Sequence, residues 1–346
     1  MPGAGHPQPQ VLAAPDKLKG TLGAAGAAAA VEQAAAAAGW RADACPLSDG
    51  GEGFADVLAS LGGEVRETTV SGPLGAPVTA RWRMAGDQAV VESAAASGLV
   101  LAGGRRGNDP VRASSRGTGE LLVAAASAGA RRILVGVGGS AMTDGGSGAV
   151  EAVEECGGLG QVEVVVACDV TALFVDAAER FGPQKGADPG QVGVLRARLE
   201  DLAGRYRQRY GVDVSSLAGS GAAGGLAGGL AALGATLVPG FDLVAGVVGL
   251  EARVAGADLV VTAEGRLDAS SWDGKVVGGV VELARRHGRP AVVVAGTTGD
   301  GGAGEAARRG VEVLDLAARF GVKRARHDTA ACIAAMVGEV LRRVSG

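Results

Sequence analysis

The sequence has few of the residues that most often carry metal, redox or nucleophilic chemistry. Aromatic residues make up 3% of the 346 positions, three residues are His and four are Cys. The cysteines show no C-x-x-C spacing, which argues against a structural zinc site. With so few histidines, two of them in charged contexts, a Ser-His-Asp triad is not expected. Proton transfer must therefore fall to a carboxylate or a lysine.

Other features that would identify a partner are also missing. The net charge is −4 without a basic block, so nucleic acid is not an expected partner. Residues 1–10 lack a basic segment followed by an apolar run and are expected to be a flexible tail. Residues 217–241 are uncharged, but their eight glycines and acidic flanks predict a buried segment and no membrane span. Together with the scattered cysteines, this predicts a cytoplasmic protein.

What the sequence does contain is a series of short apolar runs separated by Ala-rich stretches. Continuous β-branched runs alternating with helical stretches indicate a parallel sheet covered on both faces. The runs lie at 10–16, 131–139, 162–169, 257–265 and 289–298, with weaker versions at 42–53 and 310–317.

Residues 64–93 have a different pattern. Val78, Ala80, Trp82 and Met84 alternate with polar residues between two turn signals, which predicts an antiparallel meander. Such a block among parallel units suggests an inserted domain. We expect a first α/β domain at 11–66 plus 249–346, and a second α/β domain at 67–248.

Carboxylates gather where these strands are expected to end. In open α/β sheets ligands bind outside the carboxyl ends of the strands, and acids there can hold Mg²⁺. A single Asp in this position is commonly a helix N-cap or turn former, but Glu is a poor N-cap. The acids are Asp16, Asp49, Glu52, Asp144, Asp169, Glu264 and Asp268.

Glycine-rich loops accompany these acids. The loop 136–148, with Gly138, Gly139 and Ser140, runs from a strand into a helix, and 219–225 contains Gly221. Such loops let backbone N–H groups approach phosphate, although close packing also explains many glycine loops. No P-loop motif occurs, and the G-x-G-x-x-A match lacks the acid that binds a nucleotide ribose, which disfavours an NAD-dependent oxidoreductase.

Lysine is rare in this chain, five of 33 basic residues, and four of the five lie in loop-like sequence. They are Lys17, Lys19, Lys185 and Lys275. An ammonium on a flexible stem can follow a phosphoryl group as a point charge. Acids for Mg²⁺ together with lysines and glycine loops for phosphate describe phosphoryl transfer. Chance retention of lysine codons is the alternative.

Several segments in unbroken order resemble the bacterial-type glycerate kinase family. They include "APDKLKGTL", "LSDGGEGFADVL", "VGVGGSAMTDGGSG", "FGPQKGA" and "TAEGRLD". The resemblance implies ATP- and Mg²⁺-dependent phosphorylation of D-glycerate, typically to 2-phosphoglycerate. It also implies a flavodoxin-like domain that carries a second domain of restriction-enzyme-like fold.

The chain departs from the family pattern at a few places. Lys17-Leu18 replaces Ser-Phe, and a longer segment expected between the helix at 148–155 and the strand at 162–169 is shortened to 156–161. The loop at 170–180 is also shortened. These departures leave open a catalytically silent regulator that binds a sugar acid or nucleotide.

The resulting expectations are specific. Asp49, Lys19, Lys185 and Asp169 are expected to be catalytic. Cofactor contacts are expected from Gly138, Gly139, Ser140, Gly221 and Lys275. Substrate contacts are expected from Asp16, Glu52, Arg116 and Thr118. Metal ligands are expected to be Asp144, Asp169, Glu264 and Asp268.

Overall fold

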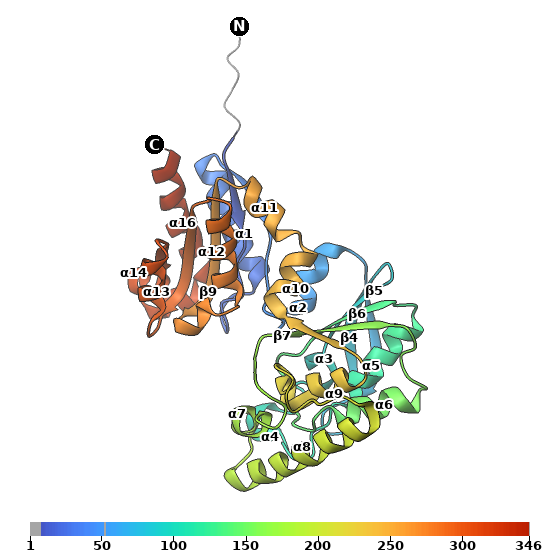
Figure 1. The fold of residues 1–346 in the computed structure, drawn as a ribbon. Coiled ribbons are helices and arrows are strands. Elements are labelled where there is room, and N and C mark those ends of the chain that lie inside the picture. Colours follow the sequence, from blue (N-terminus) through green and yellow to red (C-terminus); the bar gives the residue numbers. More distant parts are fainter. Residues whose placement is uncertain (1–7, 52, 346) are drawn as a thin grey trace. The chain divides into compact units, whose positions relative to one another are not determined.

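The computed structural model describes residues 8–51 and 53–345. The chain divides into two compact units, residues 1–49 with 244–346, and residues 50–243. Figure 1 shows the first unit built from blue and orange-to-red segments, the two ends of the chain, and the second from the segments between them. Glu52 and most of the expected tail lie outside the described residues.

The first unit contains a five-stranded, fully parallel sheet in the order β11-β10-β9-β1-β2. In chain order this is 2-1-3-4-5, the flavodoxin-like arrangement, whose switch point lies between the first and third strands. Here those strands are β1 and β9. All five coincide with predicted runs: β1 (Gln10–Ala13), β2 (Arg41–Ala44), β9 (Leu259–Leu267), β10 (Ala291–Thr298) and β11 (Glu312–Asp315).

Small side chains allow the helices of this unit to approach the sheet closely. Helix α1 (Ala24–Ala38) buries Ala27, Ala28, Val31 and Ala35, at helical spacing, and ends at a left-handed Gly39. Figure 1 shows α16 (Thr329–Ser345) beside it. The remaining helical segments are α11 (Leu250–Gly256), η4 (Ala269–Trp272), α12 (Val276–Arg286), α13 (Gly302–Arg308), α14 (Leu316–Phe320) and α15 (Val322–His327).

The second unit contains a mixed six-stranded sheet in sequential order from β3 to β8. The β3–β4 and β4–β5 pairs are antiparallel, which confirms the predicted meander, and the pairs from β5 to β8 are parallel. Strand β8 lies in the uncharged 217–241 segment and was not predicted. The strands are β3 (Glu64–Ser71), β4 (Pro77–Ala85), β5 (Gln88–Glu92), β6 (Arg132–Gly136), β7 (Glu163–Cys168) and β8 (Thr236–Pro239).

Glycine in the 217–241 segment serves close backbone packing. Gly224 has φ +69°, and a Cβ on it would lie 2.1 Å from the carbonyl oxygen of Met142.

Among the described residues no helix is long and apolar enough to span a membrane. The helical segments of this unit are α2 (Phe54–Val57), η1 (Leu58–Leu61), α3 (Ala94–Ser97), α4 (Gly104–Gly107), α5 (Arg116–Ser127), α6 (Ser147–Glu155), α7 (Ala177–Phe181), η2 (Pro183–Lys185), α8 (Pro189–Tyr210), η3 (Ala222–Gly225) and α9 (Leu226–Ala232), and α10 (Gly240–Val247) crosses the junction.

The observed junctions, 49/50 and 243/244, differ from the expected 66/67 and 248/249. The first difference has a structural reason, because β3 forms its ladder with β4 and therefore belongs to the second sheet. Phe54 also packs inside that unit, where a Cβ on Gly136 would lie 2.9 Å from its ring. The restriction-enzyme-like fold of the second unit stays a prediction.

Candidate functional site

The switch point of the first unit brings two predicted acids together. Asp16 follows β1, and its backbone N–H donates to the carbonyl of Ala263, the residue before Glu264 in β9, at 2.9 Å. Asp16, just beyond β1, therefore lies beside Glu264 of the neighbouring parallel strand β9, at the switch point where ligands of this fold class bind.

Burial gives both carboxyl groups unusual proton affinities. It raises the pKa of Asp16 to about 6, with the charge of Asp49 adding to the effect. Burial likewise raises the pKa of Glu264 to about 7, and the hydrogen bond from Ser271 opposes that rise. Within the described part of the chain, Oε1 of Glu264 is buried without a hydrogen-bond partner. An unsatisfied carboxylate of this kind fits a bound cation.

Lysine contacts this group from the turn after β1. Nζ of Lys17 lies 3.7 Å from Oδ1 of Asp49, and the Lys17 backbone N–H donates to Oδ1 of Asp16 at 2.7 Å. Lys19 is exposed, and its backbone packs against Gly265, whose Cβ would lie 2.8 Å from the Lys19 nitrogen. Lys17 is not part of the family motif, so the motif did not predict its contact with Asp49. The sequence feature that could have predicted it is the presence of two rare lysines, Lys17 and Lys19, in the same turn.

Asp268 and Lys275 share a serine near Glu264. Asp268 is the N-cap of η4: Oδ1 accepts hydrogen bonds from the Ser270 backbone and hydroxyl at 2.9 and 2.7 Å, and the hydroxyl bond is the main reason its pKa is lowered. Nζ of Lys275 donates to the same hydroxyl at 3.1 Å. Asp268 therefore matches the cap interpretation, and its capping bonds occupy one of its oxygens.

The predicted acid of the second unit has a structural environment. Asp144 is 5% exposed, and its Oδ2 accepts hydrogen bonds from the backbone and hydroxyl of Ser115 at 2.7 and 2.8 Å. The backbone N–H groups of Gly146 and Gly148 donate to the same carboxylate. Because both oxygens of Asp144 accept hydrogen bonds that join the starts of α5 and α6, this carboxylate does not fit the role of a metal ligand.

Lys185 is also inside the second unit. Its side chain is 3% exposed, and Nζ donates to the carbonyl of Met142 at 2.5 Å. Burial lowers the pKa of Lys185 to about 7, against the opposing charge of Asp144. The Asn108 amide donates to the carbonyls of Ala141 and Lys185, at 3.0 and 2.9 Å. These contacts of Asn108 and Lys185 hold the 141–144 loop in place. The sequence analysis did not identify Asn108 as a candidate residue.

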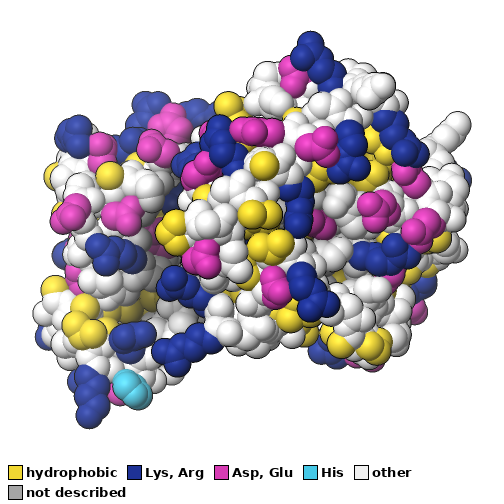
Figure 2. All heavy atoms as spheres, turned by 90° about the horizontal axis from the view of Figure 1, so that it is seen from below, with side chains coloured by type: hydrophobic (Ala, Val, Ile, Leu, Met, Phe, Trp, Pro, Cys, Tyr) yellow, Lys and Arg dark blue, Asp and Glu magenta, His cyan; other side chains and the backbone are white. Residues whose placement is uncertain are grey.

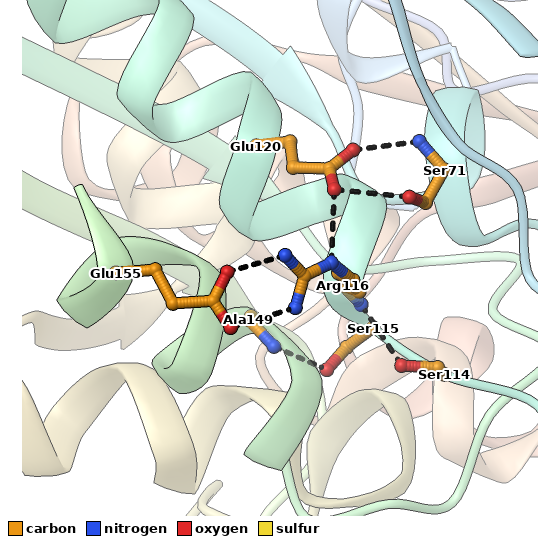
Figure 3. A network of polar contacts seen from close by, with 7 residues as sticks. All are labelled: Ser71, Ser114, Ser115, Arg116, Glu120, Ala149 and Glu155. Atoms are coloured by element: carbon orange, nitrogen blue, oxygen red, sulfur yellow. Dashed lines mark hydrogen bonds and ion pairs between the residues drawn. The ribbon is translucent and has the colours of Figure 1, made fainter. Parts of the chain in front are cut away.

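Two predicted substrate ligands make their contacts within the second unit. The Arg116 guanidinium pairs with Glu120 at 3.1 Å and with both carboxylate oxygens of Glu155, joining α5 to α6 (Figure 3). Thr118 is fully buried, and its hydroxyl lies 2.9 Å from that of Ser97. Neither arrangement is that of an open ligand site.

The remaining predicted residues lie on loops of the second unit. Gly138 and Gly139 are half-buried and exposed, and Ser140 is buried. A Cβ on Gly221 would lie 2.3 Å from the Leu173 carbonyl oxygen, so packing alone requires a glycine there. Asp169 directly follows β7 and is half-buried.

The metal predictions can be tested against the donor sets. Within residues 8–51 and 53–345, no group of three His, Cys, Asp or Glu side chains forms a metal site. Mg²⁺ is commonly held by one or two carboxylates together with phosphate oxygens, so it does not need such a group. Asp16 and Glu264 fit this arrangement. Asp144 and Asp169 belong to the other unit.

Comparison with known proteins gives a consistent result. The model of the glycerate kinase family matches residues 11–156 and 157–345. The glycerate 2-kinase of Escherichia coli K12 is 37% identical, covering 84% of this chain and 86% of its own. The Halalkalibacterium halodurans glycerate kinase gives the same three percentages. A crystal structure from Salmonella typhimurium LT2, described as that of a glycerate kinase 2, superposes on this chain with a TM-score of 0.81 and 31% sequence identity. The match covers 97% of this chain and 98% of that one.

Proposed function

The chain belongs to the glycerate kinase family and is a glycerate kinase, and we propose that it transfers the γ-phosphoryl group of ATP to the 2-hydroxyl of D-glycerate with Mg²⁺. The observation that carries this assignment of the chemistry is the pair of desolvated carboxyl groups, Asp16 and Glu264, at the switch point of the first unit. The Escherichia coli relative is a glycerate 2-kinase, which supports the 2-hydroxyl.

The reaction needs a base for the glycerate hydroxyl. Asp49 is the candidate: it lies beyond β2, and Lys17 holds its carboxylate at 3.7 Å. Asp49 would accept the hydroxyl proton as the glycerate oxygen attacks phosphorus.

Positive charge for the transferred phosphoryl group is available from the same unit. Lys19 is exposed on the turn after β1, and Lys275 lies at the start of α12, where it also lowers the pKa of Glu264. Flexible ammonium groups can follow the phosphoryl group between donor and acceptor. The Lys185 side chain is enclosed, so we assign it to holding the 141–144 loop.

Asp16 and Glu264 would hold Mg²⁺. When bound there, the ion would neutralise phosphate charge. Oε1 of Glu264, which has no hydrogen-bond partner among the described residues, supports this role, because burial of a carboxylate oxygen without a donor or a cation is costly. Asp268 would act by fixing Ser270 and the start of η4. The second-unit loops 136–148 and 219–225, with Asp169, remain predictions for nucleotide or glycerate contacts. The charges on the face seen in Figure 2 are of both signs and interspersed, which supports a small-molecule substrate over nucleic acid.

The purified chain should convert D-glycerate and ATP to 2-phosphoglycerate only when Mg²⁺ is added. Phosphorus NMR distinguishes this product from 3-phosphoglycerate. Removal of Mg²⁺ by chelation should abolish turnover, and its return should restore it. No turnover with any short hydroxy acid, alongside measurable ATP binding, would contradict the proposal and favour a binding protein.

A further inference from the structure

The second unit contains a cavity at the end of its sheet opposite the carboxyl ends of the strands. Its volume is about 470 Å³, within the range of small-molecule sites. It lies where β7 begins, where the chain enters β8, and where helices α6 and α9 end. The apolar side chains that line it are Val153, Leu159, Val162, Val164, Leu230 and Leu233.

One wall of this cavity is bare backbone. Gly157, Gly158 and Gly160 have φ between +63° and +88°, and a Cβ on any of them would meet no atom within 4 Å. These three glycines therefore place no side chain in the cavity. Val153 and Leu230 are 2% and 1% exposed and form a closed apolar floor.

The charged side chains lining the cavity are an ion pair. NH2 of Arg209 lies 2.7 Å from Oε1 of Glu154, and the hydroxyl of Tyr210 donates to that same oxygen at 2.5 Å. The Arg209 side chain is 65% exposed and that of Glu154 is 30% exposed, so the pair stands at the mouth. A second cavity of about 250 Å³ shares both residues, so the pair is open to solvent from two sides.

The charges at the mouth select the ligand. An anion near Arg209 also meets the Glu154 carboxylate, and a cation near Glu154 also meets the guanidinium. A molecule that carries an ammonium and a carboxylate on one carbon can pair with both. Exchange of an exposed ion pair for two others is nearly neutral, so burial of an apolar body would supply the affinity.

We propose that this cavity binds a small aliphatic α-amino acid, with its side chain on the apolar floor, its carboxylate on Arg209 and its ammonium on Glu154. The site lies within the second unit and does not depend on the proposed kinase reaction. A side chain the size of that of leucine fits the volume. The dissociation constant should be on the order of 10 mM, as expected when burial of one apolar side chain drives binding.

Calorimetric titration of the full chain tests this with four compounds. L-Leucine should bind, and 4-methylpentanoate, which lacks the ammonium, should bind at least about tenfold more weakly. Isopentylamine lacks the carboxylate and glycine lacks the apolar body, and the same loss is expected for each. Failure of leucine to bind, or equal binding of leucine and either singly charged analogue, would overturn the proposal.

Variants locate the binding to this cavity. Arg209→Gln and Glu154→Gln should each weaken leucine binding about tenfold or more. Arg207→Gln, in an exposed arginine of the same helix that pairs with Asp213 at 4.0 Å, should leave it unchanged. Ala235→Phe should fill the cavity and abolish binding while the melting curve stays cooperative. Retention of leucine binding in Ala235→Phe, or equal effects of the two arginine changes, would place the ligand elsewhere and refute the assignment.

Discussion

Glu264 should make the protein without Mg²⁺ less stable above pH 7 than near pH 5. Its pKa is raised from an ordinary value of 4.5 to about 7, first by burial. Between these two values the native protein binds more protons at this site than the unfolded chain does. The free energy of unfolding therefore falls as the pH rises from 4.5 to 7, and the whole loss is present above pH 7.

The magnitude follows from the proton affinity. A rise from 4.5 to about 7 corresponds to about 3 kcal/mol at pH 8, and partial solvent access reduces this to about 2–3 kcal/mol. Glu264→Gln keeps the shape of the side chain and removes the charge. The variant should therefore be more stable than the natural protein by that amount at pH 8, and by less than about 1 kcal/mol at pH 5.

Chemical denaturation of both proteins at pH 5 and pH 8, without Mg²⁺, measures this difference. Glu32→Gln, on the exposed face of α1 in the same unit, is the matched control and should change little at either pH. A gain in stability that is equal at the two pH values would refute the argument from burial. So would a variant that is less stable than the natural protein at pH 8.

Three further predictions concern individual roles. Asp49→Asn should leave the melting temperature unchanged and lower kcat by about 10²–10⁴-fold, as expected for loss of a general base; an effect on melting alone would make Asp49 a structural residue. Lys185→Arg should lower the free energy of unfolding by about 1–3 kcal/mol in denaturation experiments, because the larger guanidinium does not fit the buried space of the Lys185 side chain. The control, Lys323→Arg in the exposed α15 helix, should leave the free energy of unfolding unchanged. Arg116→Ala should slightly lower the melting temperature at low salt and have almost no effect in about 1 M salt, where exposed ion pairs are screened; a large rise in KM for glycerate would instead show that Arg116 binds substrate.

The strands of both sheets were largely predictable from the sequence, because β-branched runs and a period of two are local signals. Strand β8 was missed since Thr236–Pro239 follows a long stretch of Gly and Ala that has no such pattern. The first domain boundary expected from the sequence, 66/67, differs from the 49/50 division for a related reason: the pairing of β3 with β4 and the packing of Phe54 beside Gly136 are not local properties.

For the site, the sequence indicated which residues were unusual, and side-chain environment decided what each does. Asp16 and Asp144 are both acids beyond strand ends, yet one is desolvated next to other carboxylates and the other accepts four hydrogen bonds. Lys17 and Lys185 are both rare lysines, but one contacts Asp49 and the other is buried and donates to the carbonyl of Met142, 43 residues earlier in the chain. Such differences depend on contacts between distant segments, which motif spacing does not report.

The position of the metal tests the central claim most directly. A crystal structure of the chain with D-glycerate, a non-hydrolysable ATP analogue and Mn²⁺ in place of Mg²⁺ would locate the ion by its anomalous scattering. We predict an ion about 2.0–2.2 Å from a carboxylate oxygen of Asp16 or Glu264, with phosphate oxygens completing its shell. An ion bound at Asp144, or one with neither Asp16 nor Glu264 near it, would contradict the account.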